Sequence, residues 1–149
     1  MGIKYVHTNI ISKDWKELSS FYIKVFDCIP LSERDLSGEW IDKMTQIDKV
    51  KIKGIHLALP GYENGPTLEI FQYYPEDPNP IMSKINNPGY RHIAFHVDNV
   101  EEVLQKVIEH DGKQIGELIK KQYETLGLLT AVYVEDPEGN IIEIQNWKK

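Results

Sequence analysis

The spacing of apolar residues changes along the chain, and these changes predict where helices and strands lie. In residues 14–26 apolar side chains recur every three or four positions, which predicts a helix with one buried face, capped by Ser12 or Asp14. Residues 100–110 repeat this spacing and predict a second helix. Alternating or β-branched segments predict strands. The predicted strands are residues 5–11, 30–35, 54–60, 67–74, 90–97, 115–120, 128–135 and 140–146.

The predicted elements fall into two halves with the same order. Each half begins with a strand and a helix and continues with about three strands, and the proline-rich residues 75–89 connect the halves. Residues 136–139, with the sequence DPEG, predict the turn of the last hairpin. Residues 36–53 show no clear pattern and are predicted to contain an insertion. The repeat predicts two modules, one over about residues 4–74 and one over about residues 90–147.

Net charge and cysteine content exclude several classes of protein. The formal net charge is −6, which argues against a nucleic acid or an anionic membrane as partner, because either needs a basic face. Cys28 is the only cysteine, so neither an intrachain disulfide nor a site of several thiolates can form. The first 13 residues contain neither a secretory signal nor a membrane-spanning run. We therefore expect a cytoplasmic protein.

Two histidines and two glutamates occupy matching places in the two halves. His7 and His92 lie in the first strand of each half, and Glu69 and Glu143 lie in the last. Side chains alternate across a strand, so each glutamate points away from its apolar neighbours. A carboxylate directed into a cavity is stable only when it is paired, protonated or bound to a cation. Each residue taken singly is more often exposed or structural, but the matched placement of all four predicts a shared site.

Two imidazoles and two carboxylates form a mixed nitrogen and oxygen ligand set. Such a set favours a divalent Zn, Ni or Co ion and is also compatible with Mn and Fe(II). Four protein ligands leave two positions open on a six-coordinate ion, where water or substrate can bind and react. We therefore predict that His7, Glu69, His92 and Glu143 bind one divalent metal ion.

Several segments resemble the vicinal oxygen chelate superfamily, which includes glyoxalase I, methylmalonyl-CoA epimerase, extradiol dioxygenases and fosfomycin-resistance enzymes. The most specific segments are GYRHIAFHV and DPEGNIIEI, while HTNIIS with the helix after it and TLEIFQY extend the resemblance over nearly the whole chain. The resemblance implies one α+β domain over residues 1–149. In such a domain two βαβββ modules pair as an open, cup-shaped mixed β-barrel around the metal ion, with helices outside.

The order His, Glu, His, Glu is most similar to glyoxalase I (lactoylglutathione lyase). Epimerases typically carry glutamine at the second position, and extradiol dioxygenases and fosfomycin enzymes typically use two histidines and one glutamate, so Glu69 argues against both. The resemblance implies a metal-dependent lyase or isomerase that moves a proton through a metal-bound enediolate, with Glu143 as base and Glu69 as its partner.

Three alternatives to this function share the same fold. One is an isomerase similar to methylmalonyl-CoA epimerase. Another is an Fe(II) dioxygenase of extradiol type that uses His7, His92 and Glu143. The third is a non-catalytic protein that binds a small molecule.

The expected partner is a small-molecule substrate, with a glutathione or other thiol adduct as one candidate. Glyoxalase I usually holds the glutathione carboxylates with arginines, and Arg34 and Arg91 are the only arginines of this chain. Asn9, His96 and Gln145 share strand faces with the predicted ligands and are candidates for substrate binding or for hydrogen bonds to the ligands. We also expect a homodimer, because small paired modules leave sheet edges to cover. The modules can pair within one chain or across this dimer.

Overall fold

A computed structural model describes residues 2–77, 79 and 84–149 of the chain. The chain divides into two compact units, Met1–Pro80 and Ile81–Lys149. Among the described residues, no helix has the length and apolar character needed to span a membrane.

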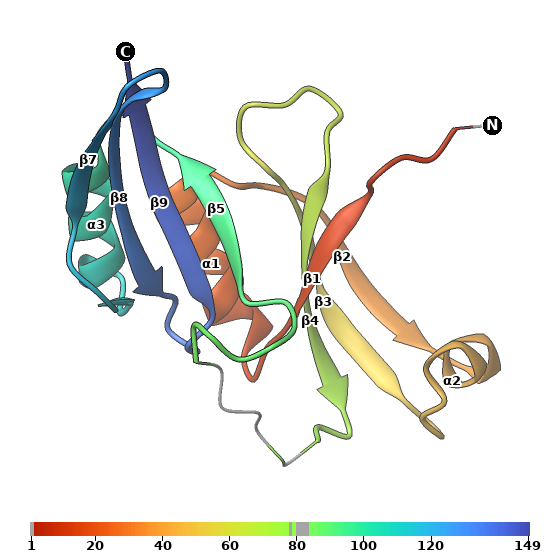
Figure 1. Ribbon diagram of the computed structural model, residues 1–149. Coiled ribbons are helices and arrows are strands. Elements are labelled where there is room, and N and C mark those ends of the chain that lie inside the picture. Colours follow the sequence, from red (N-terminus) through yellow and green to blue (C-terminus); the bar gives the residue numbers. More distant parts are fainter. Residues whose placement is uncertain (1, 78, 80–83) are drawn as a thin grey trace. The chain divides into compact units, whose positions relative to one another are not determined.

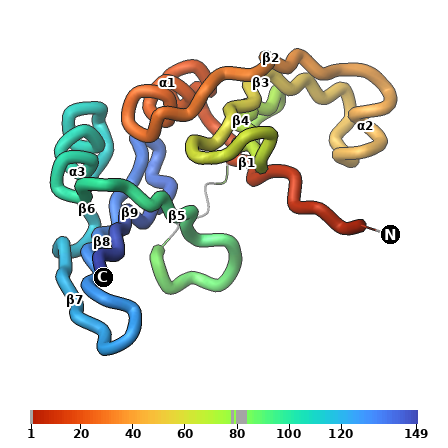
Figure 2. The backbone as a smooth tube through the Cα atoms, turned by 90° about the horizontal axis from the view of Figure 1, so that it is seen from above, coloured from red at the N-terminus to blue at the C-terminus, as the bar shows by residue number. Residues whose placement is uncertain are grey.

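The first unit is built around a mixed sheet whose strands follow the order β1-β4-β3-β2. Strands β1 and β4 are parallel, whereas β3 is antiparallel to both β4 and β2. Figure 2 shows α2 as a projection at the end of β2 and β3. The elements are β1 (His7–Ile11), α1 (Trp15–Phe26), β2 (Ile29–Ser37), α2 (Glu39–Thr45), β3 (Lys51–Ala58) and β4 (Thr67–Tyr74).

Helix α1 forms because its sequence supplies both a cap and a buried face. The Asp14 carboxylate accepts a hydrogen bond from the backbone N–H of Glu17, which settles the choice between Ser12 and Asp14 as the cap. Leu18 and Tyr22 are almost fully buried on the side that packs against β3 and β4. This packing leaves the opposite face of the sheet for polar side chains.

The second unit repeats this design around strands in the order β5-β9-β8-β6, with β7 also paired to β8. Figure 1 shows β7, β8, β9 and β5 side by side. Strands β5 and β9 are parallel, and the other pairs are antiparallel. Helix α3 packs against β8 and β9. The elements are β5 (His92–His96), α3 (Val100–Glu109), β6 (Lys113–Gln114), β7 (Ile119–Tyr123), β8 (Gly127–Glu135) and β9 (Ile141–Lys148).

The predicted α+β class and the strand–helix–strands order of each half are confirmed. Across the described residues neither sheet closes into a barrel, because each strand order has two free edges. The predicted turn over residues 136–139 is also present, since the Gly139 N–H donates to the Asp136 carbonyl. The pairing of the modules into one cup-shaped domain stays a prediction. Of the predicted connection, residues 78 and 80–83 lie outside the described part of the chain.

Two stretches differ from the sequence prediction. Residues 36–53 hold the end of β2, all of α2 and the start of β3. Helix α2 was missed because Ile41 is its only buried residue, so it shows no apolar periodicity. The predicted strand at residues 115–120 is wrong over most of its length, because β6 ends at Gln114 and β7 begins at Ile119; the residues of both strands are exposed. Without a buried face, neither strand shows alternation.

Candidate functional site

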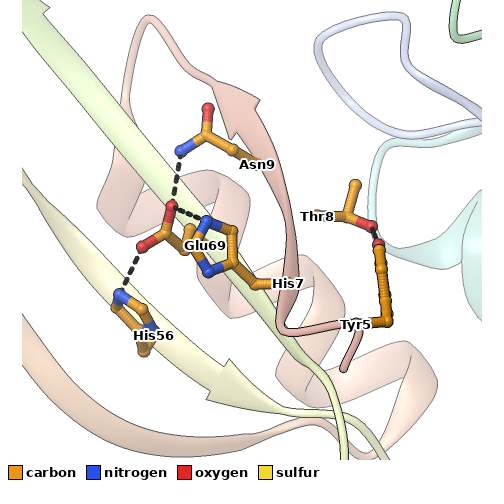
Figure 3. Close-up of polar contacts among 6 residues, drawn as sticks. All are labelled: Tyr5, His7, Thr8, Asn9, His56 and Glu69. Atoms are coloured by element: carbon orange, nitrogen blue, oxygen red, sulfur yellow. Dashed lines mark hydrogen bonds and ion pairs between the residues drawn. The ribbon is translucent and has the colours of Figure 1, made fainter. Parts of the chain in front are cut away.

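A row of three polar residues crosses the first sheet on one face. Strand register places Asn9 of β1 opposite Glu69 of β4, and Glu69 opposite His56 of β3. His7 lies two residues before Asn9 and therefore on the same face. Figure 3 shows the side chains of His7, Asn9 and His56 directed at the Glu69 carboxylate.

The Glu69 carboxylate is buried and is surrounded by three donor groups. Its Oε1 accepts a hydrogen bond of 3.1 Å from Asn9 Nδ2 and lies 3.0 Å from His7 Nε2. Its Oε2 lies 2.5 Å from His56 Nε2. The side chain of Glu69 is 10% exposed. A carboxylate offers about four lone-pair positions, so three donors leave this one nearly saturated.

The two histidines must carry hydrogen on the nitrogens that face Glu69, because an ionised carboxylate can only accept. Burial lowers the pKa of His56, while the neighbouring Glu69 raises it and the neighbouring Arg34 and His7 lower it. His56 is therefore a neutral donor at neutral pH. The pKa of Tyr73 is raised, first by burial and then by the Glu69 charge. A metal ion at His7 would require Nε2 to give up its hydrogen to the other nitrogen or to solvent.

Phe71 lies at one side of the row formed by Asn9, Glu69 and His56. It lies opposite Gly54 in the strand register, and its ring is 5.9 Å from that of His56. A Cβ atom at Gly54 would lie 2.7 Å from a ring carbon of Phe71 and 2.1 Å from the Ile70 carbonyl oxygen. Only glycine allows this close approach.

The second sheet carries an equivalent row with different chemistry. Strand register places Ala94 of β5 opposite Glu143 of β9, and Glu143 opposite Tyr133 of β8. His92 lies two residues before Ala94 on the same face, and its ring packs 5.2 Å from that of Tyr133. His92 Nε2 is 3.9 Å from Glu143 Oε2, too long for a hydrogen bond. The side chains of His92 and Glu143 are 35% and 21% exposed.

A chain of two hydrogen bonds leads to Glu143 along β9. Gln145 Nε2 donates to Glu143 Oε2 over 3.2 Å. Trp147 Nε1 donates to Gln145 Oε1 over 2.8 Å. Within the described part of the chain, Glu143 thus has one close donor, whereas Glu69 has three.

The structure brings together the predicted ligands of each unit in pairs. His7 lies with Glu69, and His92 lies near Glu143. Among the described residues, no three His, Cys, Asp or Glu side chains form a group that could hold a metal ion. The predicted set takes two residues from each unit, so the four-ligand site stays a prediction.

The predicted substrate-binding residues are distributed over both sheets. Asn9 and Gln145 are hydrogen-bonded to the glutamates, and His96 is exposed on the face that carries Glu143. Arg34 is exposed on β2, opposite Gly54. Arg91 lies just before β5, and its Nε and Nη1 are buried without a hydrogen-bond partner in the described part of the chain. Substrate binding by these residues stays a prediction.

His56 was not assigned a role from the sequence. The available signal was the alternation of β3, in which Gly54, His56 and Ala58 share one face. The register between β3 and β4 then places His56 beside Glu69. Sequence alone does not specify that register, so the partner of His56 could not be read from it.

Comparison with known proteins adds the family. The sequence model of the Glyoxalase/Bleomycin resistance protein/Dioxygenase superfamily matches residues 4–144, nearly the whole chain. The chain belongs to this superfamily. This confirms the resemblance to vicinal oxygen chelate proteins found in the sequence. No match was found among the curated proteins.

Solved structures of superfamily members have the same fold. A glyoxalase family protein from Bacillus cereus is 19% identical with a TM-score of 0.76, over 99% of this chain and 94% of that one. The trypanothione-dependent glyoxalase I of Leishmania major is 23% identical with a TM-score of 0.60, over 97% and 87%. FosX, a fosfomycin resistance protein of Listeria monocytogenes solved with Mn(II) and sulfate, is 16% identical with a TM-score of 0.55, over 97% and 91%. At these identities the likeness establishes the fold alone.

Proposed function

We propose that this superfamily member is a metal-dependent lyase or isomerase of glyoxalase I type. The observation that carries the proposal is that each sheet sets a histidine and a glutamate on one face, with Nε2 of the histidine towards the carboxylate. His7, Glu69, His92 and Glu143 would together hold one divalent ion. Their nitrogen and oxygen atoms suit Zn, Ni or Co best and also accept Mn and Fe(II). When bound, the ion would act as a Lewis acid that stabilises negative charge on a substrate oxygen.

The two glutamates are suited to different tasks. Glu69 is buried and has three donors, so it is poorly placed to take up and release a proton. Glu143 is partly exposed and has one close donor, so it keeps free lone pairs. In the proposed reaction Glu143 removes a proton from one substrate carbon and returns it to the neighbouring carbon. The proton and the electron pair stay within the substrate and Glu143, so no oxidant is needed.

The test combines metal content with turnover. Protein purified without added metal is analysed for bound Zn, Ni, Co, Mn and Fe. It is then assayed with the hemithioacetal of methylglyoxal and glutathione and with methylmalonyl-CoA, which separates a glyoxalase from an epimerase. We expect turnover of the hemithioacetal and a loss of about a thousandfold in kcat for Glu143→Gln, the usual range for a general base.

The matched control is Glu117→Gln, which changes an exposed glutamate of the same unit outside the site. It should leave kcat unchanged. Protein that binds none of these metals and turns over neither substrate would contradict the proposal. Sedimentation of the same preparation tests the proposed homodimer, because a monomer at assay concentration would exclude it.

An Fe(II) dioxygenase is the second candidate, and the saturation of Glu69 favours it. Asn9 and His56 already occupy one position on each oxygen of Glu69, so the ligand set could reduce to His7, His92 and Glu143. Two histidines and one carboxylate are typical of Fe(II) oxygenases. Oxygen uptake with a catechol and Fe(II), together with full metal affinity of Glu69→Gln, would support this candidate. A large loss of metal affinity in Glu69→Gln would argue against it.

A further inference from the structure

Glu143, Gln145 and Trp147 occupy alternate positions of β9 and are joined by hydrogen bonds. The Trp147 indole N–H donates to Gln145 Oε1, and Gln145 Nε2 donates to Glu143 Oε2. All three side chains are half-buried. The contacts lie within one strand, so they form as soon as β9 does.

The indole of Trp147 fixes the donor and acceptor of each of these hydrogen bonds. An indole N–H can only donate, so Gln145 must present its carbonyl oxygen to Trp147. The amide nitrogen then faces Glu143, and the Glu143 oxygen beside it must accept. A flipped amide would set N–H against N–H at Trp147, so the amide has one stable orientation.

Packing keeps the indole in place. The Trp147 ring lies 5.4 Å from the Tyr123 ring of β7, and Lys121 Nζ lies 5.8 Å from the centre of the Tyr123 ring. Trp147 also lies opposite Leu129 in the β8–β9 register. The indole therefore has an aromatic neighbour besides its hydrogen bond, which limits its rotation.

The first unit has no such chain at the equivalent positions. There Phe71 and Tyr73 follow Glu69 at the same intervals, and the donors come from other strands. The second glutamate is thus held on one oxygen only, by its own strand. This difference indicates a separate role for Gln145 and Trp147, which follow Glu143 at alternate positions of β9.

We propose that Trp147 and Gln145 are positioning residues for Glu143, a proposal that rests on the proposed function. By holding Oε2, the oxygen that lies 3.9 Å from His92 Nε2, they fix the orientation of the Glu143 carboxylate towards the metal ion and the substrate proton. In this role both residues act through Glu143 and need no contact of their own with the metal ion or the substrate. Loss of either lets the Glu143 side chain rotate, which lowers metal affinity and kcat together.

The first measurement tests the hydrogen bonds that join Trp147, Gln145 and Glu143 in protein without metal. The indole N–H signals of the three tryptophans are recorded in ¹⁵N-labelled protein, and Trp147→Phe identifies the signal of Trp147. We expect Gln145→Leu to move this signal and to leave those of Trp15 and Trp40 in place. An unmoved Trp147 signal would overturn the proposal, because the hydrogen bond would then not exist in solution. Gln145→Met, which keeps the side-chain length, is the second variant if Gln145→Leu does not fold.

The second measurement titrates the same proteins with Ni²⁺ by calorimetry and then measures hemithioacetal turnover. We expect Gln145→Leu and Trp147→Phe to bind Ni²⁺ about tenfold more weakly, the lower end for residues behind a metal ligand. We expect kcat to fall with little change in KM. The matched control is Trp40→Phe, which removes an indole hydrogen bond to the Ser37 carbonyl in the first unit and should change neither value.

The outcomes separate this inference from the proposed function. If the wild-type protein binds Ni²⁺ and both variants bind it equally well, the positioning role is wrong and the proposed function stands. If the wild-type protein binds none of Ni²⁺, Zn²⁺, Co²⁺, Mn²⁺ and Fe²⁺, the proposed function fails and the positioning role fails with it.

Discussion

The two units place a histidine and a glutamate at equivalent positions and treat the glutamate differently. In the first unit, Asn9 and His56 flank Glu69 across the sheet and donate to its two oxygens. In the second unit, Ala94 and Tyr133 occupy these flanking positions. The neighbours on adjacent strands, rather than the glutamate itself, therefore decide how strongly each carboxylate is held.

This difference shows that a repeated module can place its glutamate in two environments that differ in burial and in the number of hydrogen-bond donors. Glu69 is buried and compensated by three donors, which suits an anchor. Glu143 is twice as exposed and has one close donor, which suits a group that exchanges protons or binds a cation. The predictions below test whether the two glutamates differ in this way in solution.

The largest expected difference is in stability when each glutamate is replaced by glutamine. Glu69→Gln removes a buried anion and turns one acceptor oxygen into a donor beside existing donors, so we expect a loss of about 3 kcal/mol in the free energy of unfolding. Glu143→Gln should change it by less than about 0.5 kcal/mol. Urea unfolding followed by circular dichroism measures both. Equal losses would show that the two sites do not differ.

Replacing the histidine that lies closest to Glu69 should have the next largest effect. His56→Leu removes the donor to Oε2 and leaves that oxygen buried and unpaired, which should cost about 2 kcal/mol. The matched variant is His92→Leu in the second unit, where the 3.9 Å separation from Glu143 is no hydrogen bond. We expect His92→Leu to cost less than about 0.5 kcal/mol. The same unfolding assay measures both variants. A loss of stability for His92→Leu as large as for His56→Leu would contradict the prediction.

An alkaline titration should distinguish the first unit from the second, because only the first contains a cysteine. Burial, with a smaller contribution from the Asp27 charge, raises the pKa of Cys28 from 9.0 to about 12. The thiol ionises at lower pH in the unfolded state than in the folded state. The contribution of Cys28 to the free energy of unfolding is therefore complete below about pH 9 and decreases as pH rises towards 12. At pH 10 the loss is about 1.4 kcal/mol. Unfolding at pH 8 and pH 10 measures it.

The control for this titration is Cys28→Ala, which should lack that part of the pH dependence. The same dependence in Cys28→Ala and the wild-type protein would show that the thiol of Cys28 ionises equally in the folded and unfolded states.

The smallest expected effect comes from making the two rows more alike. Asn9→Ala removes a donor to Glu69 Oε1 and should cost about 1 kcal/mol. Ala94→Asn adds an amide at the equivalent position beside Glu143, on an exposed face. If the rows are equivalent, this second change should weaken Ni²⁺ binding, because the new donor competes for the carboxylate. Unchanged Ni²⁺ affinity in Ala94→Asn would show that the rows do not correspond.

Much of the fold was predictable because its signals are local. The helix over residues 14–26 and the strand over 67–74 were found from apolar spacing and β propensity, which depend on neighbours in sequence. The short helix α2 was missed because only Ile41 is buried, so no repeat marks it. The strand predicted at residues 115–120 misses β6 and most of β7 for the same reason, since both strands have no buried face.

The repeat of two modules, the four candidate ligands and the sheet face of each could be read from the sequence, because alternation along a strand is a local property. The number of donors around each glutamate, three for Glu69 and one for Glu143 among the described residues, emerged from the folded structure. The donor Asn9 comes from β1, 60 residues before Glu69, and the donor His56 comes from the neighbouring strand β3. Whether these donors lie beside Glu69 depends on strand order and register, which long-range packing determines.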